Sequence, residues 1–339
     1  MDPLTHALAS YTLKRAAFPR AARPLTVAMV IAGTIADLDS FSTYFGPSVY
    51  LSTYRAGFHS VLAAVVFALL VSLPFLIRKP ASDGKKVSPL LVFVATLSAA
   101  ILHLLLDLCQ TTGVELFWPF SARRFALDWV ARLDLWILTI VLAGIFLPLL
   151  SGLVTEEIGA RSKGPRGRTG AFLAFAALIL YLTARFVLHT SAVTTLESRT
   201  YRGESPRRVV ALAEPGSPFR WHGIVETESA LHDVDVEVGP AANFDPDSAV
   251  SSYKPEASPA LDAARKSSVA RRFLQVARFP KATVETSPEG FHVILRDFPY
   301  AQDASSGCPV EAVMDTDGSG KILSQELEWD PAHREAWWK

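Results

Sequence analysis

The chain has 339 residues, of which 50% are hydrophobic and 19% charged, and its mean hydropathy is +0.25. This composition excludes an ordinary soluble protein of this length, and the formal net charge of +0 gives no global field that would favour nucleic acid as a partner. Nearly all the long apolar runs lie in residues 1–190. The sequence therefore predicts a multi-span α-helical membrane domain (1–190) followed by a small soluble α+β domain (191–339).

The membrane domain is expected to contain about five apolar helices and one interfacial segment. A moderately apolar helix is predicted over 3–18, and five longer apolar runs follow it. Runs of about 20 residues are long enough to cross a hydrocarbon layer of ~30 Å. The apolar runs lie at 24–45, 58–77, 87–109, 133–154 and 170–189.

Two connecting segments have a different character. A polar and aromatic loop is expected over 46–57. The aromatic stretch 111–132 is expected to lie at the membrane interface, where Trp118 and Trp129 suit the headgroup region.

Basic residues beside the apolar runs predict the topology. Dense clusters at 20–23, 78–86 and 161–168 share one face if the spans alternate, and the positive-inside rule makes that face cytoplasmic. The loops 46–57 and 110–132, and everything after 190, then fall outside. The outer loops also contain basic residues, which count mildly against this assignment but are less dense: Arg55, Arg123, Arg124 and Arg132.

After residue 190 the pattern becomes that of an α+β domain. A helix is predicted over 258–277, with its start marked by Pro259. The two cysteines, Cys109 and Cys308, are too few for a disulfide framework. Alternating apolar residues predict strands over 209–212, 221–238, 283–286, 291–297 and 311–314.

Histidines and aspartates interrupt the apolar runs at four places. His103 and Asp107 are four residues apart and share one face of a helix, and His6, Asp37 and His59 lie on three other segments. Ionisable groups are costly inside a membrane unless they are paired or bound to metal. At ~1.5 Å per residue, each segment places its polar group roughly 21–28 Å above the basic inner face. This agreement in depth predicts a single site near the outer surface.

The residue types at this predicted site suit a divalent metal. Imidazole nitrogens and carboxylate oxygens are ligands of zinc, manganese and iron, and zinc is favoured here. A metal would lower the pKa of its water towards ~7 and supply a nucleophile. Asp39 is expected to be a further ligand or a general base, and Arg55 a clamp for a substrate anion. The predicted metal ligands are His6, Asp37, Asp39, His59, His103 and Asp107.

Each of these groups also has a structural explanation when it is taken alone. His6 fits a hydrogen bond between helices, Asp39 fits a helix cap, and His103 with Asp107 fits a buried pair without metal. Arg55 fits an interfacial residue whose charged end reaches the headgroups. The alternative to a metal site is therefore a non-enzymatic scaffold or partner-binding protein in which buried polar groups brace the helices. Transport of a metal or proton is disfavoured, because the spans below the site are almost purely apolar.

Several stretches in order resemble a known family. They are MDPLTHAL, GTIADLDS, Arg55 with His59-Ser60, and HLLLDLCQTTGVELFWPFS, and they resemble the YdjM-like family of predicted membrane-bound metal-dependent hydrolases over about residues 1–140. The resemblance implies a multi-span protein of the bacterial inner membrane with a hydrolase-type metal site. All six predicted ligands fall on the family's motif positions. Tyr54 replaces a histidine usual in the family, which argues against a full two-metal site or removes one substrate contact.

A second motif lies near the carboxyl end. Residues 315–326 match an EF-hand calcium loop, with Gly320 sixth and Glu326 twelfth. An EF-hand needs a helix on both sides, whereas 309–314 and 321–329 have the pattern of strands. We therefore expect a hairpin turn between Asp315 and Glu326 in preference to a calcium site.

Together these patterns predict a membrane-embedded hydrolase that uses a divalent metal to cleave a lipid or lipid-linked ester or phosphoester at the outer leaflet. The expected location is the bacterial cytoplasmic membrane, with several spans and the carboxy-terminal domain outside. The expected partner is the lipid or lipid-linked substrate. Nucleic acid is not expected as a partner, and the sequence does not indicate a protein partner.

Overall fold

The computed structural model describes residues 1–19, 23–77, 88–157, 167–239, 242, 244–299 and 307–331. Within these ranges, the side chains of 77 and 151–157 are not described. They divide into two compact units. The first consists of Met1–Asp39, Arg55–Leu127 and Leu133–Phe186, and the second of Ser40–Tyr54, Asp128–Arg132 and Val187–Lys339.

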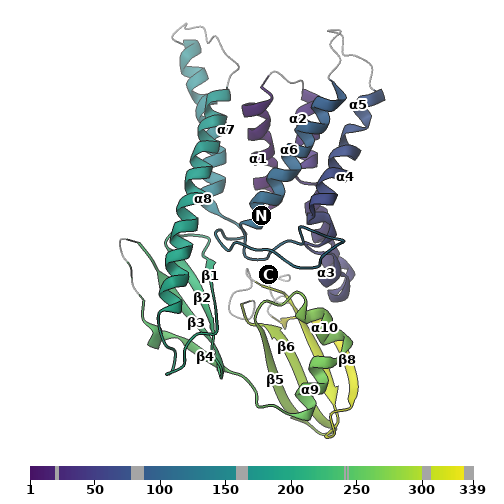
Figure 1. The fold of residues 1–339 in the computed structure, drawn as a ribbon. Coiled ribbons are helices and arrows are strands. Elements are labelled where there is room, and N and C mark those ends of the chain that lie inside the picture. Colours follow the sequence, from purple (N-terminus) through teal and green to yellow (C-terminus); the bar gives the residue numbers. More distant parts are fainter. Residues whose placement is uncertain are drawn as a thin grey trace. The chain divides into compact units, whose positions relative to one another are not determined.

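The first half of the chain is helical, as predicted, and Figure 1 shows its helices. Two short 3₁₀ segments, η1 and η2, interrupt the α-helices. The elements are α1 (Pro3–Ala17), α2 (Arg23–Ala32), η1 (Ile35–Phe45), α3 (Pro47–Thr53), η2 (Gly57–His59), α4 (Val61–Ser72), α5 (Pro74–Ile77), α6 (Pro89–Leu108), α7 (Leu135–Glu157) and α8 (Arg168–Glu197).

Helix α6 is central in the first unit, where it packs against α1, α2 and α4 (Figure 1). Its contact face carries small residues such as Ala95 and Ala99, which are fully buried. Thr96 Oγ1 lies 3.3 Å from the Ala68 carbonyl oxygen of α4, to which it donates a hydrogen bond. Small side chains let membrane helices approach closely, and such close packing replaces the hydrophobic drive that lipid removes.

Two described helices, α6 and α8, are individually long and apolar enough to cross a membrane. Two bent pairs pass the same test as joined segments: α2 with η1, bent by 43°, and the pair Pro47–His59 and Val61–Leu76, bent by 70°. The apolar part of α7, Leu135–Leu150, is shorter. The described residues thus contain two to four candidate spans, fewer than the five long runs predicted.

The two apolar runs over 24–45 and 58–77 belong to bent pairs of helical segments. The first run breaks after α2 at Gly33, whose position leaves no room for a side chain because a Cβ there would lie 2.0 Å from Ser10 Oγ of α1. The second ends α4 just before Pro74, which cannot continue the hydrogen-bond ladder. The predicted loop 46–57 instead contains helix α3, which has Pro47 at its first turn.

Much of the charge pattern that predicted the topology falls outside the described residues. Arg23 and Arg168 are described, and they begin α2 and α8. The other residues of these clusters, outside the described ranges, are Arg20, Arg78, Lys79, Lys85, Lys86, Arg161, Lys163 and Arg166.

The second unit contains two four-stranded antiparallel sheets, in the orders β1-β2-β3-β4 and β5-β6-β7-β8 (Figure 1). Helices α9 (Pro259–Lys266) and α10 (Ser268–Leu274) pack on the second sheet. The strands are β1 (Arg208–Ala213), β2 (Arg220–Glu226), β3 (Ala230–Glu237), β4 (Val250–Tyr253), β5 (Pro280–Ser287), β6 (Gly290–Asp297), β7 (Val310–Thr316) and β8 (Ile322–Trp329).

All five predicted strand regions are strands, but one of them contains two strands, and the predicted helix is divided in two. The stretch 221–238 forms two strands, β2 and β3, joined by a turn in which Thr227 N–H donates to the Ala230 carbonyl at 2.9 Å. The predicted helix 258–277 is split into α9 and α10 at Ser267. Its hydroxyl caps α10 by accepting from Ala270 N–H at 3.0 Å, which favours a new helix start over continuation.

The calcium-like motif is part of the β7–β8 hairpin, as predicted. Asp317 uses one carboxylate oxygen to accept backbone N–H bonds from Ser319 and Lys321, both at 2.9 Å. Asp315 contacts His292 Nδ1 at 2.7 Å and accepts from Ser324 at 2.5 Å. These acidic side chains therefore stabilise the turn and its flanking strands.

Candidate metal centre

Asp107, on the last turn of α6, is fully buried and lies at the centre of the polar cluster. Three histidines reach it from three other positions. His6 Nε2 is 3.2 Å from its Oδ1, and His59 Nε2 and His103 Nε2 are 3.0 Å and 3.4 Å from its Oδ2. The four segments that the sequence predicted to meet therefore do meet in the first unit, at the amino end of α1 and the carboxyl end of α6.

His6 is held in the first turn of α1. Asp2 caps this helix, because its carboxylate accepts from the Thr5 backbone N–H at 2.9 Å and from the Thr5 hydroxyl at 2.6 Å. The helix thus starts at a fixed residue and directs His6 inward. The His6 ring stacks on the His103 ring, with a distance of 3.8 Å between the ring centroids.

His103 is oriented by a backbone carbonyl. Its Nδ1 lies 2.9 Å from the Gly33 oxygen, which is available because α2 ends there and terminal carbonyls have no partner within the helix. A carbonyl oxygen only accepts hydrogen bonds, so Nδ1 of His103 carries the proton. In the neutral ring Nε2 then has a free lone pair that faces Asp107, which is the arrangement found in metal-binding histidines.

His59 is oriented in the same way by Asp39. One Asp39 oxygen lies 2.8 Å from His59 Nδ1 and also accepts from the Arg55 backbone N–H at 2.7 Å. With Nδ1 facing this carboxylate, His59 Nε2 points at Asp107. Asp39 therefore lies behind His59 and acts on the cluster through it.

Arg55 places a guanidinium beside the central carboxylate. Its Nη2 donates to Asp107 Oδ1 at 3.1 Å and to Gln110 Oε1 at 3.2 Å. The backbone of Arg55 has a φ of 55°, in the left-handed region, and is held by Asp39 on one side and by the Glu115 N–H on the other at 3.1 Å. Glu115 belongs to the segment 111–132 that was predicted to be interfacial, so this segment helps to fix Arg55. Trp118, in the same segment, has an exposed side chain.

The donor atoms lie close enough together for a single ion. Four residues each offer one ligand atom, and these atoms all lie within 4.8 Å of one another: His6, Asp37, His103 and Asp107. Asp37 is the most accessible of the predicted ligands, because its side chain is 12% exposed, whereas that of His103 is 2% exposed and that of Asp107 is 0%.

Three buried donor atoms fit the hypothesis of a metal. They have no hydrogen-bond partner among the described residues, although each lies in a polar cluster: His6 Nδ1, His103 Nε2 and Asp107 Oδ2. A bound cation would supply the partner that these buried atoms lack.

Sequence reasoning thus found the groups that converge but missed two that support them. Gln110 donates to Asp107 Oδ1 at 2.5 Å and accepts from Arg55. Its position three residues after Asp107, just past the end of α6, was a usable signal. The role of the Gly33 carbonyl had no sequence signal, because it depends on where α2 ends.

A family model described as YdjM inner membrane protein matches residues 1–192, which is more than half of the chain and includes every residue of the cluster. The chain belongs to the YdjM inner membrane protein family. This membership confirms the resemblance seen in the sequence, and with the apolar helices it identifies a membrane protein. No curated protein and no solved structure matched the chain.

Proposed function

We propose that this YdjM family member is a membrane-embedded metal-dependent hydrolase that acts on a lipid or lipid-linked ester or phosphoester at the outer leaflet. The observation that supports the proposal is that three histidines contact the buried carboxylate of Asp107, with Asp37 beside His103 and Asp39 behind His59. Structural histidine bonds between helices do not require such convergence.

The residues that would hold the metal are those with ligand atoms facing Asp107. We assign this role to His6, His103 and Asp107, with Asp37 in reach of the same ion, and to His59, whose Nε2 lies 3.0 Å from Asp107 Oδ2. The set of nitrogen and oxygen donors favours zinc, with manganese or iron as further candidates. Such a metal supplies Lewis-acid activation of water and of the bond to be cleaved.

The chain's other residues would position the reactants and move protons. Asp39 fixes His59 through Nδ1, and we treat it as a positioning residue. Asp37, the most accessible carboxylate, is the better placed of the two to accept a proton from water, so we assign the role of base to it. Arg55 offers a guanidinium beside the site, which suits a phosphate or another anion that develops during hydrolysis.

The substrate class follows from the surroundings. The site lies at one end of apolar helices in a membrane protein, and the charge pattern of the sequence favours the outer leaflet for that end. Large apolar side chains are exposed on the segment that holds Arg55, among them Phe117 and Phe120. A lipid headgroup linkage would reach this site without leaving the bilayer interface.

Hydrolysis of synthetic lipid substrates by the purified full chain tests the proposal. Fluorogenic phosphodiester and carboxyl-ester lipids are presented in nanodiscs, with each divalent metal in turn. We expect a metal-dependent activity that falls by roughly 10³-fold or more in His103→Ala and persists in Asp134→Asn, which changes a carboxylate that instead caps α7. Turnover of neither ester class with any metal would contradict the proposal.

A second candidate function, a bracing scaffold, is favoured by the contacts themselves. Asp107 already contacts Arg55, Gln110 and three histidines, so the cluster could hold α1, η2 and α6 together without an ion. A brace predicts that added metal leaves the unfolding midpoint unchanged. A metal at ~100 times its Kd would instead stabilise the protein by about 2.7 kcal/mol.

A further inference from the structure

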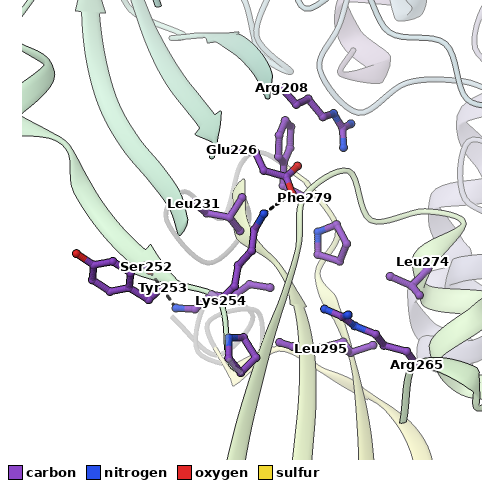
Figure 2. Close-up of a pocket in the computed structure, with 14 residues that line it drawn as sticks. Arg208, Glu226, Leu231, Ser252, Tyr253, Lys254, Arg265, Leu274, Phe279 and Leu295 are labelled. Atoms are coloured by element: carbon purple, nitrogen blue, oxygen red, sulfur yellow. Dashed lines mark hydrogen bonds and ion pairs between the residues drawn. The ribbon is translucent and has the colours of Figure 1, made fainter. Parts of the chain in front are cut away.

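The second unit contains a cavity of about 590 Å³ that is separate from the polar cluster of the helices. It is lined by residues of both sheets and of the α9–α10 segment, and Figure 2 shows these side chains. Ligand pockets of small organic molecules commonly measure ~300–1,000 Å³, so this cavity has the size of a binding site. Nothing in the proposed hydrolase chemistry uses it.

The lining is strongly cationic. Arg208, Lys254, Arg265 and Lys281 line the cavity, and the one acidic residue of the lining is Glu226. These cations come from different elements: the start of β1, the residue after β4, helix α9 and strand β5. Figure 2 shows Arg208 and Arg265 approaching the cavity from different sides. The fold thus brings side chains of like charge close together, although they repel one another.

One acid neutralises one of these cations. Lys254 Nζ lies 2.8 Å from Glu226 Oε1 and also donates to the Thr227 carbonyl. Lys281 Nζ instead donates to the Ser252 hydroxyl at 3.1 Å. Among the described residues, neither Lys281 nor Arg265 forms an ion pair with a carboxylate. A formal excess of positive charge therefore remains in the cavity.

The cavity also has an apolar wall. The Arg208 guanidinium lies over the Phe279 ring, with Cζ 4.1 Å from the ring centroid, and Phe279 itself is buried. Leu231 and Leu295 are buried beside it, while Tyr253 lines the rim. Arg208 Nη1 also donates to the Arg278 carbonyl at 2.6 Å, and the other guanidinium donors are able to bind an anion.

We propose that this cavity binds a small organic phosphate. Arg208, Arg265 and Lys281 would bind the phosphate oxygens, since guanidinium groups match the geometry of phosphate and several cations suit its multiple charge. The organic part would lie against Phe279 and Tyr253. The phosphate belongs either to a soluble metabolite or to a lipid headgroup, which the experiment distinguishes.

Binding of phenyl phosphate to the full chain in detergent, measured by calorimetry, tests the proposal. We expect Arg265→Gln and Lys281→Gln each to weaken binding by roughly 10-fold or more, because each removes a charge-assisted hydrogen bond. Arg265→Lys retains the charge and should retain most of the binding. The matched control is Lys266→Gln, which changes an exposed neighbour on α9 outside the lining and should bind like the wild type.

The same titration in a His103→Ala background separates this site from the proposed metal site, because the cavity should bind equally well there. Competition by phosphatidylglycerol vesicles would identify a lipid headgroup as the source, and binding without such competition would identify a soluble phosphate. Absence of binding by the wild type, loss of binding in His103→Ala, or equal binding by Arg265→Gln, Lys281→Gln and Lys266→Gln would overturn the proposal.

Discussion

Replacement of Asp39 by asparagine is the sharpest single test of how the metal centre is built. Asp39 is buried and does not contact Asp107; it contacts the centre through His59 Nδ1 at 2.8 Å and through the Arg55 backbone at 2.7 Å. Asparagine has nearly the same shape, and its one oxygen can occupy the position of the Asp39 oxygen that makes both contacts, but it lacks the charge. The contact with His59 Nδ1 is therefore weaker, and His59 is oriented less firmly while it remains in place.

The expected magnitude follows from the role of an orienting carboxylate. Loss of such a partner typically weakens metal binding by about 10–100-fold, or about 1.4–2.8 kcal/mol. Removal of a direct ligand, as in Asp107→Ala, should abolish stoichiometric binding. We expect the affinity of Asp39→Asn for zinc to lie between those of the wild type and Asp107→Ala.

The assay is competition for zinc between the detergent-solubilised protein and a chromophoric chelator of known affinity. Asp134→Asn is the matched control, because Asp134 is also buried and accepts two backbone N–H bonds, from Trp136 and Ile137, at 3.0 Å each. It should bind zinc like the wild type. An unchanged affinity in Asp39→Asn, or a loss as complete as in Asp107→Ala, would refute the assignment of Asp39 as a positioning residue.

Three further predictions address the anion clamp, the packing and the second unit. Arg55→Gln should keep its metal content but lower kcat/KM for a phosphoester by roughly 10–100-fold; an unchanged rate would remove Arg55 from the mechanism. Gly33→Ala should destabilise the protein by about 1–3 kcal/mol, because the new Cβ meets Ser10 Oγ, and Ser10→Gly should restore the thermal unfolding midpoint; no rescue would contradict that contact. Burial lowers the pKa of His232, so the folded state binds fewer protons than the unfolded state, and stability should fall as the pH drops below about 6.5. The fall should be smaller in His232→Gln, as measured by thermal unfolding between pH 7.5 and 5; equal slopes would exclude His232 as its source.

The sequence predicted which residues form the buried polar cluster because the relevant signal is local and unusual. A histidine and an aspartate four residues apart in an apolar helix, as in His103 and Asp107, cost free energy unless they are paired or bind a ligand. The same reasoning applies to His6 and to His59. Counting residues from the basic end of each run was sufficient to place them at similar depth, even though α2 and α4 proved shorter than the runs themselves.

The supporting geometry could not be predicted because it depends on where helices end. Asp39 orients His59 only because α2 breaks at Gly33 and the chain continues as the 3₁₀ segment η1. The cationic cavity also lacked a sequence signal. Arg208 and Arg265 are 57 residues apart in number and belong to different elements, so only the packing of the two sheets and α9 shows that they line one space.

The most direct test of the central claim is the metal content of the purified full chain, measured by elemental mass spectrometry after incubation with divalent metals and removal of excess. We predict a stoichiometric amount of bound metal in the wild type and its loss in the His59→Ala/His103→Ala variant, with both proteins folded. A wild type that holds no metal, or a double variant that holds as much as the wild type, would contradict the account.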